Sequence, residues 1–212
     1  SIDKPWLKYY SEEAIQAELP ECTVLQYIKN KNTNNLNGIA LNYFGNRITY
    51  REFFENVDKV AKAFYAIGIR KGDIVTIASL HTPETIYIIY GLNKIGAVAN
   101  MVYLTLSANE IIENIKSTDS KAFIYFAMIQ EKGRIIEKEF PDIKTIILDV
   151  SDSMPWYLKY PYRLKNKKDI LGKTYRFKNF LSLGEGVVAK EMLYTKSAPA
   201  VIVYTSGTTG VP

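Results

Sequence analysis

Two patterns of apolar and polar residues alternate through the middle of this chain. Short apolar runs at 74–80, 97–102, 121–127 and 143–150 have the length of buried strands, and the segments between them have apolar residues at helical spacing. Regular alternation of strand and helix favours parallel strands joined by right-handed crossovers. The pattern therefore predicts an α/β fold with a doubly wound, mainly parallel sheet flanked by helices.

An N-terminal β-hairpin is expected ahead of this alternating region. Residues 39–50 contain two short apolar runs on either side of Gly45-Asn46, a pair that suits a two-residue turn. Thr49 and Glu52 then have the spacing of a capping box, in which each side chain binds the backbone N–H of the other residue. The hairpin is thus predicted to lead directly into a helix.

The single histidine, His81, follows the first strand of the alternating region. A histidine at the end of a strand can act as a catalyst, but no partner constellation of Ser, Cys or Asp is visible around it. Thr82 and Pro83, which follow it, are typical of the start of a helix. His81 is therefore interpreted as a loop or capping residue, and no catalytic residue is assigned within the chain.

The composition and net charge limit the kinds of protein that this chain can be. The chain has 212 residues, 47% of them hydrophobic and 23% charged, which is typical of a soluble globular protein. It has one cysteine, Cys22, so an intramolecular disulfide is excluded, and we expect a cytoplasmic location. Neither a signal peptide nor an apolar run long enough to span a bilayer is apparent. The net charge of +5 suits an anionic ligand such as a nucleotide but is too small to indicate nucleic-acid binding.

Residues 155–180 differ from the rest in being rich in aromatic and basic residues. Such a surface could bind nucleic acid, a membrane face or an acidic ligand such as coenzyme A. The simpler interpretation, which we favour, is a solvated excursion between two sheet elements whose aromatic side chains pack against one another. Peripheral contact with a membrane remains an alternative, and the oligomeric state is left open.

The last residues of the chain carry the candidate chemistry. An apolar run at 200–203 leads into a loop made of Thr, Ser and Gly. Glycine lets backbone N–H groups approach an anion, and hydroxyls can donate to its oxygens, so this arrangement suits a phosphate site. It lacks the Gly-Lys-Ser/Thr ending of the P-loop. The alternative is a flexible tail, which the buried-looking strand before it disfavours.

Residues 204–212 resemble the phosphate-binding signature of the adenylate-forming enzymes, Tyr-Thr-Ser-Gly-Thr-Thr-Gly-x-Pro, at every fixed position. Residues 49–73 and 93–100 resemble two further motifs of the same family, although Met101 stands where many members have proline. The resemblance implies that residues 1–212 are the N-terminal portion of the large AMP-binding domain, with the rest of that domain and the C-terminal domain lying beyond.

The resemblance also implies a function. It is that of an ATP-dependent carboxylate–CoA ligase, which uses Mg²⁺ and joins a carboxylic acid to coenzyme A through an acyl-adenylate. Within the family the chain is most similar to the fatty-acyl-CoA synthetases, so the implied acid is a fatty acid. Thr205 is the implied metal ligand. The implied phosphate-binding residues are Thr205, Ser206, Gly207, Thr208, Thr209 and Gly210. Alternatives are an adenylation domain that loads an amino or aryl acid onto a carrier protein, or a noncatalytic nucleotide-binding module. The chain alone is expected to be inactive.

Overall fold

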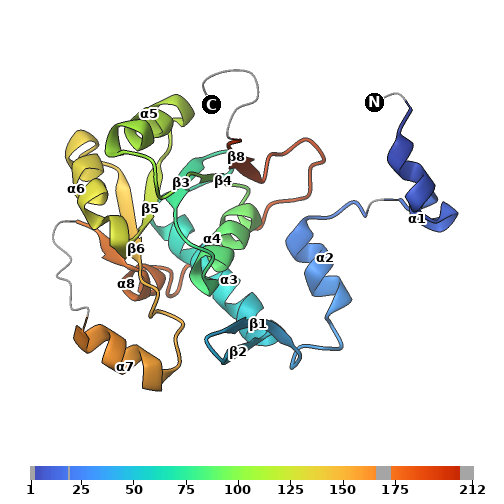
Figure 1. The fold of residues 1–212 in the computed structure, drawn as a ribbon, viewed down its shortest axis with the longest axis horizontal. Helices are drawn as coiled ribbons and strands as arrows, with labels where there is room; N and C mark the ends of the chain where they lie inside the picture. Colours follow the sequence, from blue (N-terminus) through green and yellow to red (C-terminus); the bar gives the residue numbers. More distant parts are fainter. Residues whose placement is uncertain (1–2, 19, 166–172, 206–212) are drawn as a thin grey trace.

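The computed structural model describes residues 3–18, 20–165 and 173–205, and its centre is a six-stranded sheet (Figure 1). The strand order is β7-β6-β5-β3-β4-β8, and every neighbouring pair is parallel. The strands are β3 (Ile74–Ala78), β4 (Val98–Met101), β5 (Ala122–Phe126), β6 (Lys144–Leu148), β7 (Tyr175–Arg176) and β8 (Val201–Val203). The predicted parallel sheet is confirmed.

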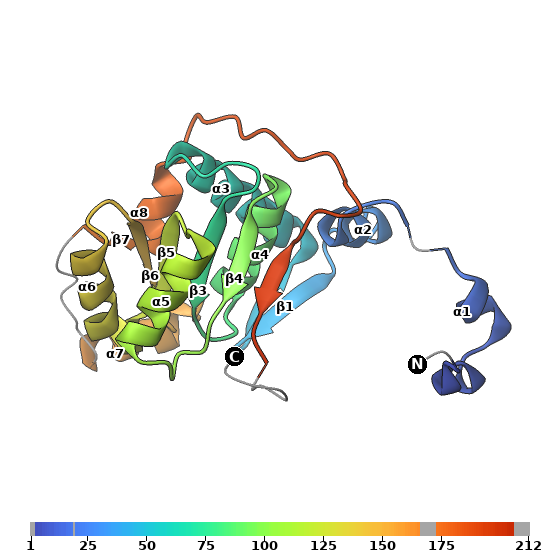
Figure 2. The same cartoon turned by 90° about the horizontal axis from the view of Figure 1, so that it is seen from above.

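Helices cover both faces of this sheet, as a doubly wound fold requires (Figures 1 and 2). One face carries α3 (Tyr50–Ala66), α4 (Pro83–Lys94) and α8 (Phe177–Ser182), and the other carries α5 (Ala108–Thr118) and α6 (Gln130–Glu139). The N-terminal helices α1 (Glu12–Gln16) and α2 (Val24–Lys31) lie to the side, preceded by a 3₁₀ turn at Pro5–Tyr9. Another 3₁₀ turn, Ala127–Ile129, precedes α6.

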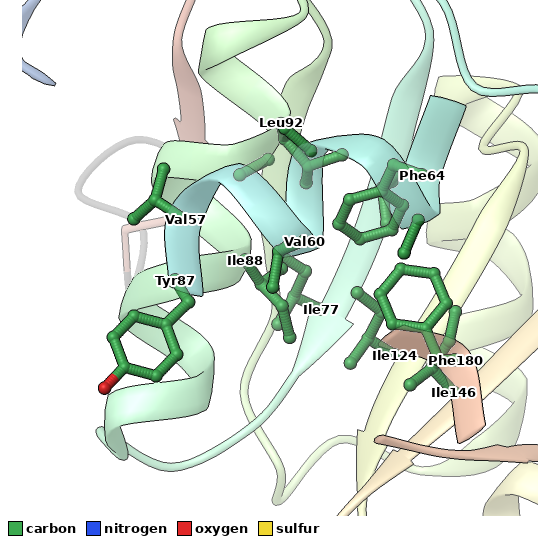
Figure 3. Packing of buried hydrophobic residues seen from close by; sticks show 14 of the residues in the cluster. Val57, Val60, Phe64, Ile77, Tyr87, Ile88, Leu92, Ile124, Ile146 and Phe180 are labelled. Carbon is green, nitrogen blue, oxygen red and sulfur yellow. The ribbon is translucent and has the colours of Figure 1, made fainter. Parts of the chain in front are cut away.

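Two apolar clusters, one on each face, hold the layers together. Side chains of β5 alternate between them: Ile124 belongs to the cluster under α3 and α4, whereas Phe123 and Tyr125 belong to the cluster under α5 and α6. In the first cluster Phe64 of α3 meets Phe180 of α8 edge-on, with ring centroids 4.8 Å apart (Figure 3). Strands buried on both faces explain why the strand segments are continuously apolar.

Local capping fixes where the helices begin. Thr49 Oγ1 accepts a hydrogen bond from the Glu52 N–H at 3.3 Å, and Glu52 Oε2 accepts one from the Thr49 N–H at 2.8 Å. Ser107 and Glu110 form the same reciprocal pair at the start of α5. The predicted capping box at α3 is confirmed, and Thr82 also caps α4 as expected.

The hairpin is confirmed, but its predicted turn is wrong by one residue. Strands β1 (Ile39–Tyr43) and β2 (Asn46–Thr49) are antiparallel, and Tyr43 pairs with Asn46. The two turn residues are therefore Phe44 and Gly45, with φ of 51° and 84°, which is the left-handed backbone of a type I′ turn. The Asn46 side chain donates to the Ser153 carbonyl at 2.9 Å, and this contact belongs to β2 rather than to the turn.

Within residues 155–180 the structure describes helix α7 (Trp156–Lys165), which follows β6, and then β7 and the start of α8. The expected solvated excursion between two sheet elements holds for α7, but it is wrong for residues 175–180, which form a strand and a helix of the core. The Trp156 and Tyr157 rings contact each other edge to face. Trp156 and Tyr160 are nevertheless largely exposed, whereas Phe177 and Phe180 contact each other and are buried, so the expectation of local aromatic packing holds for two pairs and fails for Tyr160. Helix α7 lies beyond one end of the sheet, below β6 in Figure 1.

Candidate functional site at the carboxyl edge of the sheet

The carboxyl ends of all six strands lie on one edge of the sheet because every pair is parallel. The strand order reverses at β3, since the chain goes first to β4 on one side and then to β5 on the other. In open α/β sheets ligands bind outside the carboxyl ends of the strands near such a reversal. This edge is therefore the place to look for a site.

Strand β8 brings the end of the described chain to this edge. It pairs with β4 in the register Ala99↔Val201 to Met101↔Val203, so the residues after Val203 leave the sheet at its carboxyl side. The start of β8 is held by the Ala200 carbonyl, which accepts hydrogen bonds from the Ala99 N–H at 3.1 Å and from Asn93 Nδ2 at 2.8 Å.

Tyr204 and Thr205 are the first residues beyond β8. The Tyr204 carbonyl accepts a hydrogen bond from the Tyr103 hydroxyl at 3.3 Å, and the Tyr204 side chain is half-buried against the α5/α6 cluster. Thr205 is exposed. The structure thus anchors the entrance to the predicted phosphate loop and presents its first residue to solvent. The other predicted residues, Ser206 to Gly210, lie outside the described part of the chain.

A buried polar network supports β4, the strand beside β8. Asn100 is fully buried, and its Nδ2 donates to Thr76 Oγ1 at 3.0 Å and to Asn114 Oδ1 at 2.6 Å. The Ser120 hydroxyl lies 2.6 Å from Thr76 Oγ1. The network ties β4 and β3 to α5, although Asn100 Oδ1 is buried without a hydrogen-bond partner among the residues described. Asn100 is the last residue of the second family-like motif, and its role here is structural.

A separate cleft of about 860 Å³ opens between the hairpin, α3, α4, α7 and α8. Sequence reasoning missed it, because its charged residues come from segments far apart in the chain. They are Glu52, Glu55, Lys59, Glu84, Asp149, Asp152, Lys159, Arg163, Arg176 and Lys178.

Glu84, in the first turn of α4, is the most buried carboxyl group of this cleft, with only 2% of its surface exposed. One of its oxygens accepts a hydrogen bond from the Ser153 hydroxyl, and the other, Oε2, has no hydrogen-bond partner among the residues described. Burial, above all, raises its pKa, with the nearby Asp152 adding to the effect and the Ser153 hydroxyl opposing it.

The loop between β6 and α7 is held in place by groups from several elements. The Tyr43 hydroxyl donates to the Val150 carbonyl at 3.0 Å, and burial raises the pKa of that hydroxyl to about 12, so it stays a neutral donor. Lys159 Nζ donates to the Asp152 carbonyl at 2.7 Å, and Arg163 pairs with the Asp152 carboxylate at 3.0 Å. Three of the charged residues that line the cleft, Asp152, Lys159 and Arg163, therefore serve to anchor this loop.

The described residues contain few other candidates for chemistry. His81 is exposed at the end of β3. Within the ranges 3–18, 20–165 and 173–205, no three His, Cys, Asp or Glu side chains are grouped as a metal site would need. Over the same ranges, no helix has the length and apolar character required to cross a membrane. The edge at β8 therefore remains the strongest site.

The chain is similar to known proteins in both sequence and fold. The family model described as "AMP-binding enzyme" matches residues 28–212. Acetyl-coenzyme A synthetase 1 of Saccharomyces cerevisiae is 26% identical over 178 residues, which cover 79% of this chain and 23% of that protein. The long-chain-fatty-acid–CoA ligase of Bacillus subtilis is 23% identical over 217 residues, which cover 99% of this chain and 39% of that protein.

Solved structures give the same fold. The anthranilate CoA ligase AuaEII in complex with anthranoyl-AMP aligns with a TM-score of 0.68 at 17% identity, over 91% of this chain and 33% of its own. The N-terminal domain of FACL13 from Mycobacterium tuberculosis aligns with a TM-score of 0.64 at 19% identity, over 87% of this chain and 42% of its own. The chain thus spans between about a quarter and two fifths of the length of these proteins.

Proposed function

Since the chain belongs to the AMP-binding enzyme family, we propose that it is the N-terminal portion of the large domain of an ATP-dependent carboxylate–CoA ligase. The observation that carries this proposal is the position of Thr205. Thr205 is exposed and follows strand β8 at the carboxyl edge of a parallel sheet. The sequence continues with the hydroxyl- and glycine-rich residues of the family signature.

In this proposal residues 205–210 hold the β- and γ-phosphates of ATP. Their hydroxyls and the backbone N–H groups next to the glycines donate to phosphate oxygens. Held in this way, the triphosphate is oriented for in-line attack, and charge on the departing pyrophosphate is stabilised.

The described residues also fit a role for Thr205 at Mg²⁺. Its exposed hydroxyl oxygen is a hard ligand of the kind the ion prefers, and magnesium usually takes few protein ligands beside phosphate oxygens and water. When bound, the ion neutralises charge on the phosphates. No further protein ligand is proposed from the described residues.

The proposed reaction has two steps. A carboxylate oxygen attacks the α-phosphorus of ATP, the bond to the β-phosphate oxygen breaks, and acyl-adenylate and pyrophosphate form. The thiol of coenzyme A then attacks the acyl carbonyl carbon and AMP leaves. The residues of this chain contribute to the first step by positioning the triphosphate, and no catalytic residue is assigned within it.

We propose a fatty acid as the carboxylate. Supporting this choice, the alignment with the B. subtilis long-chain-fatty-acid–CoA ligase extends over 99% of the chain. The test is a panel of acetate, a long-chain fatty acid, an aryl acid and an amino acid, supplied with ATP, Mg²⁺ and coenzyme A to the full polypeptide that carries this chain. The fatty acid should give the highest kcat/KM for acyl-CoA formation. A higher value for acetate would refute the fatty-acid assignment, and product formed only on a carrier protein would refute coenzyme A as acceptor.

The 212-residue chain by itself is proposed to be inactive, because it spans less than half of each relative described above. Carboxylate-dependent exchange of pyrophosphate into ATP by the purified 212-residue chain, at a rate comparable to that of a full-length ligase, would contradict this.

A further inference from the structure

Strand β8 is weakly held by apolar packing. Val201 is 39% exposed and Val203 is 68% exposed, and among the residues described neither apolar cluster includes a residue of β8. Residues 183–200, which lead into β8, contain no helix or strand and cross from α8 as a long connection (Figure 2). The register of a strand is strongly specified where one of its faces is buried. Contacts other than apolar packing must therefore fix β8 against β4.

The Asn93 side chain holds the start of β8. Asn93 lies in the last turn of α4, and its Nδ2 donates to the Ala200 carbonyl at 2.8 Å and to the Ala97 carbonyl at 3.3 Å. A primary amide nitrogen carries two N–H donors, so one group can bind both carbonyls. Ala97 is the residue before β4 and Ala200 the residue before β8. One side chain thus joins the end of α4 to the starts of two neighbouring strands.

The Tyr103 side chain meets β8 at its other end. Its hydroxyl donates at 3.3 Å to the carbonyl of Tyr204, the first residue after β8. The loop that carries Tyr103 is itself fixed, because Lys132 Nζ donates to the carbonyls of Leu104 and Leu106 at 2.8 and 2.7 Å. Tyr103 is 57% exposed, so its contact with Tyr204 is not a by-product of burial in the core.

We propose that Asn93 and Tyr103 are positioning residues, which fix the register of β8 against β4 and so set the place of Thr205. A slip of one residue would move Thr205 about 3.3 Å along the strand and turn its side chain to the opposite face. Hydrogen bonds to phosphate oxygens need donors within about 3.2 Å, so a loop displaced by this distance could not make them. This consequence for the phosphates rests on the function proposed above, whereas the register of β8 does not.

A second set of contacts lies upstream and does not fix the register by itself. The Met192 N–H donates to the Lys94 carbonyl at 2.8 Å, and a Cβ placed on Gly96 would lie 2.8 Å from Met192 Sδ. Residues 193–199 lie between this contact and β8 without a helix or strand. They can take up a slip of one residue, so the contacts of Asn93 and Tyr103 are the ones that oppose it.

The first test is amide hydrogen exchange in the full polypeptide that carries this chain. In Asn93→Leu and in Tyr103→Phe, residues 201–203 should each exchange about two- to tenfold faster than in the parent, and at least about tenfold faster in the double variant. Asn93→Asp, which keeps the shape of the side chain but cannot donate, should match Asn93→Leu. Exchange in β3 should stay parental, which shows that the sheet remains folded.

The matched control is Asn109→Leu/Tyr9→Phe. It makes the same two changes at exposed positions, one on α5 and one in the N-terminal 3₁₀ turn. Residues 201–203 of this control should exchange at the parental rate.

The second test is carboxylate-dependent exchange of pyrophosphate into ATP by the same variants. The Asn93→Leu/Tyr103→Phe variant should have a KM for ATP at least about tenfold above that of the parent, with an unchanged KM for the carboxylate. A loss of folded protein would lower kcat and leave both KM values unchanged. The selective change in the KM for ATP therefore identifies a positioning role.

The two tests separate this inference from the proposed function. Parental exchange of residues 201–203 in the Asn93→Leu/Tyr103→Phe variant would overturn the inference and assign the register to the contacts at Met192. A parental KM for ATP in that variant, with Thr205→Val impaired in the same assay, would overturn the positioning role and leave the proposed function standing. A parent without carboxylate-dependent exchange would refute the proposed function, and hydrogen exchange would still decide the register.

Discussion

Replacing Glu84 with glutamine tests whether burial of this carboxyl group in the cleft makes the stability of the fold depend on pH. The substitution keeps the size of the side chain and an acceptor for the Ser153 hydroxyl, and it removes a carboxyl group that is 2% exposed. Burial raises the pKa of Glu84 in the folded chain above its usual value. The folded protein therefore keeps this proton at pH values where the unfolded chain has already released it.

The sign of the effect follows from this difference. A group with a raised folded-state pKa contributes stability that is fully present below its unfolded pKa and is lost as pH rises through its folded pKa. Between those two values, the unfolding free energy of the parent should fall relative to Glu84→Gln by about 1.4 kcal/mol per pH unit. Above the folded pKa the difference should stop changing.

The assay is urea unfolding followed by circular dichroism at intervals from roughly pH 4 to pH 8, which begins near the pKa of an exposed glutamate. Glu55→Gln is the matched control, since Glu55 is exposed on α3 and lines the same cleft. It should change the unfolding free energy by less than about 0.5 kcal/mol. A parent that gains stability relative to Glu84→Gln as pH rises, or a difference that does not depend on pH, would refute the reasoning.

Three further substitutions test the packing, each by urea unfolding. Phe180→Ala removes a fully buried ring that contacts Phe64, and it should lower the unfolding free energy by about 3–5 kcal/mol. A loss below about 1 kcal/mol would show that α8 is not packed on α3 as described. Gly91→Ala places a Cβ 2.7 Å from Val60 Cγ1, and it should destabilise by about 1–2 kcal/mol despite the better helix propensity of alanine; a gain in stability would contradict the close approach of α3 and α4. Ser107→Ala removes one half of the α5 capping box and should cost about 1 kcal/mol, and no change would mean that the cap does not hold the helix start in solution.

The features predicted correctly from the sequence depend on short-range patterns. The apolar runs predicted the strands correctly because a sheet covered on both faces needs continuous apolar segments. The cap at Thr49 was predictable because its partner, Glu52, is only three residues away. The turn was misplaced by one residue because Phe44 adopts a left-handed backbone that favours glycine, asparagine or aspartate, and a local rule does not expect a phenylalanine there.

The features that the sequence did not predict depend on long-range contacts. Glu84 and Ser153 are 69 residues apart, and nothing near either residue indicates that they meet. The position of β8 beside β4 is likewise set by tertiary packing, yet it decides where the phosphate loop leaves the sheet. The aromatic residues of α7 were noticed in the sequence, but their outward direction follows from the polar anchors at Asp152.

The most direct test of the central claim, that the loop beginning at Thr205 holds the phosphates of ATP, is carboxylate-dependent exchange of labelled pyrophosphate into ATP. It compares Thr205→Val with Thr195→Val, a second exposed threonine in the segment before β8, in the full polypeptide that carries this chain. Loss of a hydroxyl that binds a charged phosphate should slow exchange by about tenfold to a hundredfold, while Thr195→Val should exchange at the parental rate. Equal rates for the parent and Thr205→Val, or exchange that does not require a carboxylate, would contradict the account.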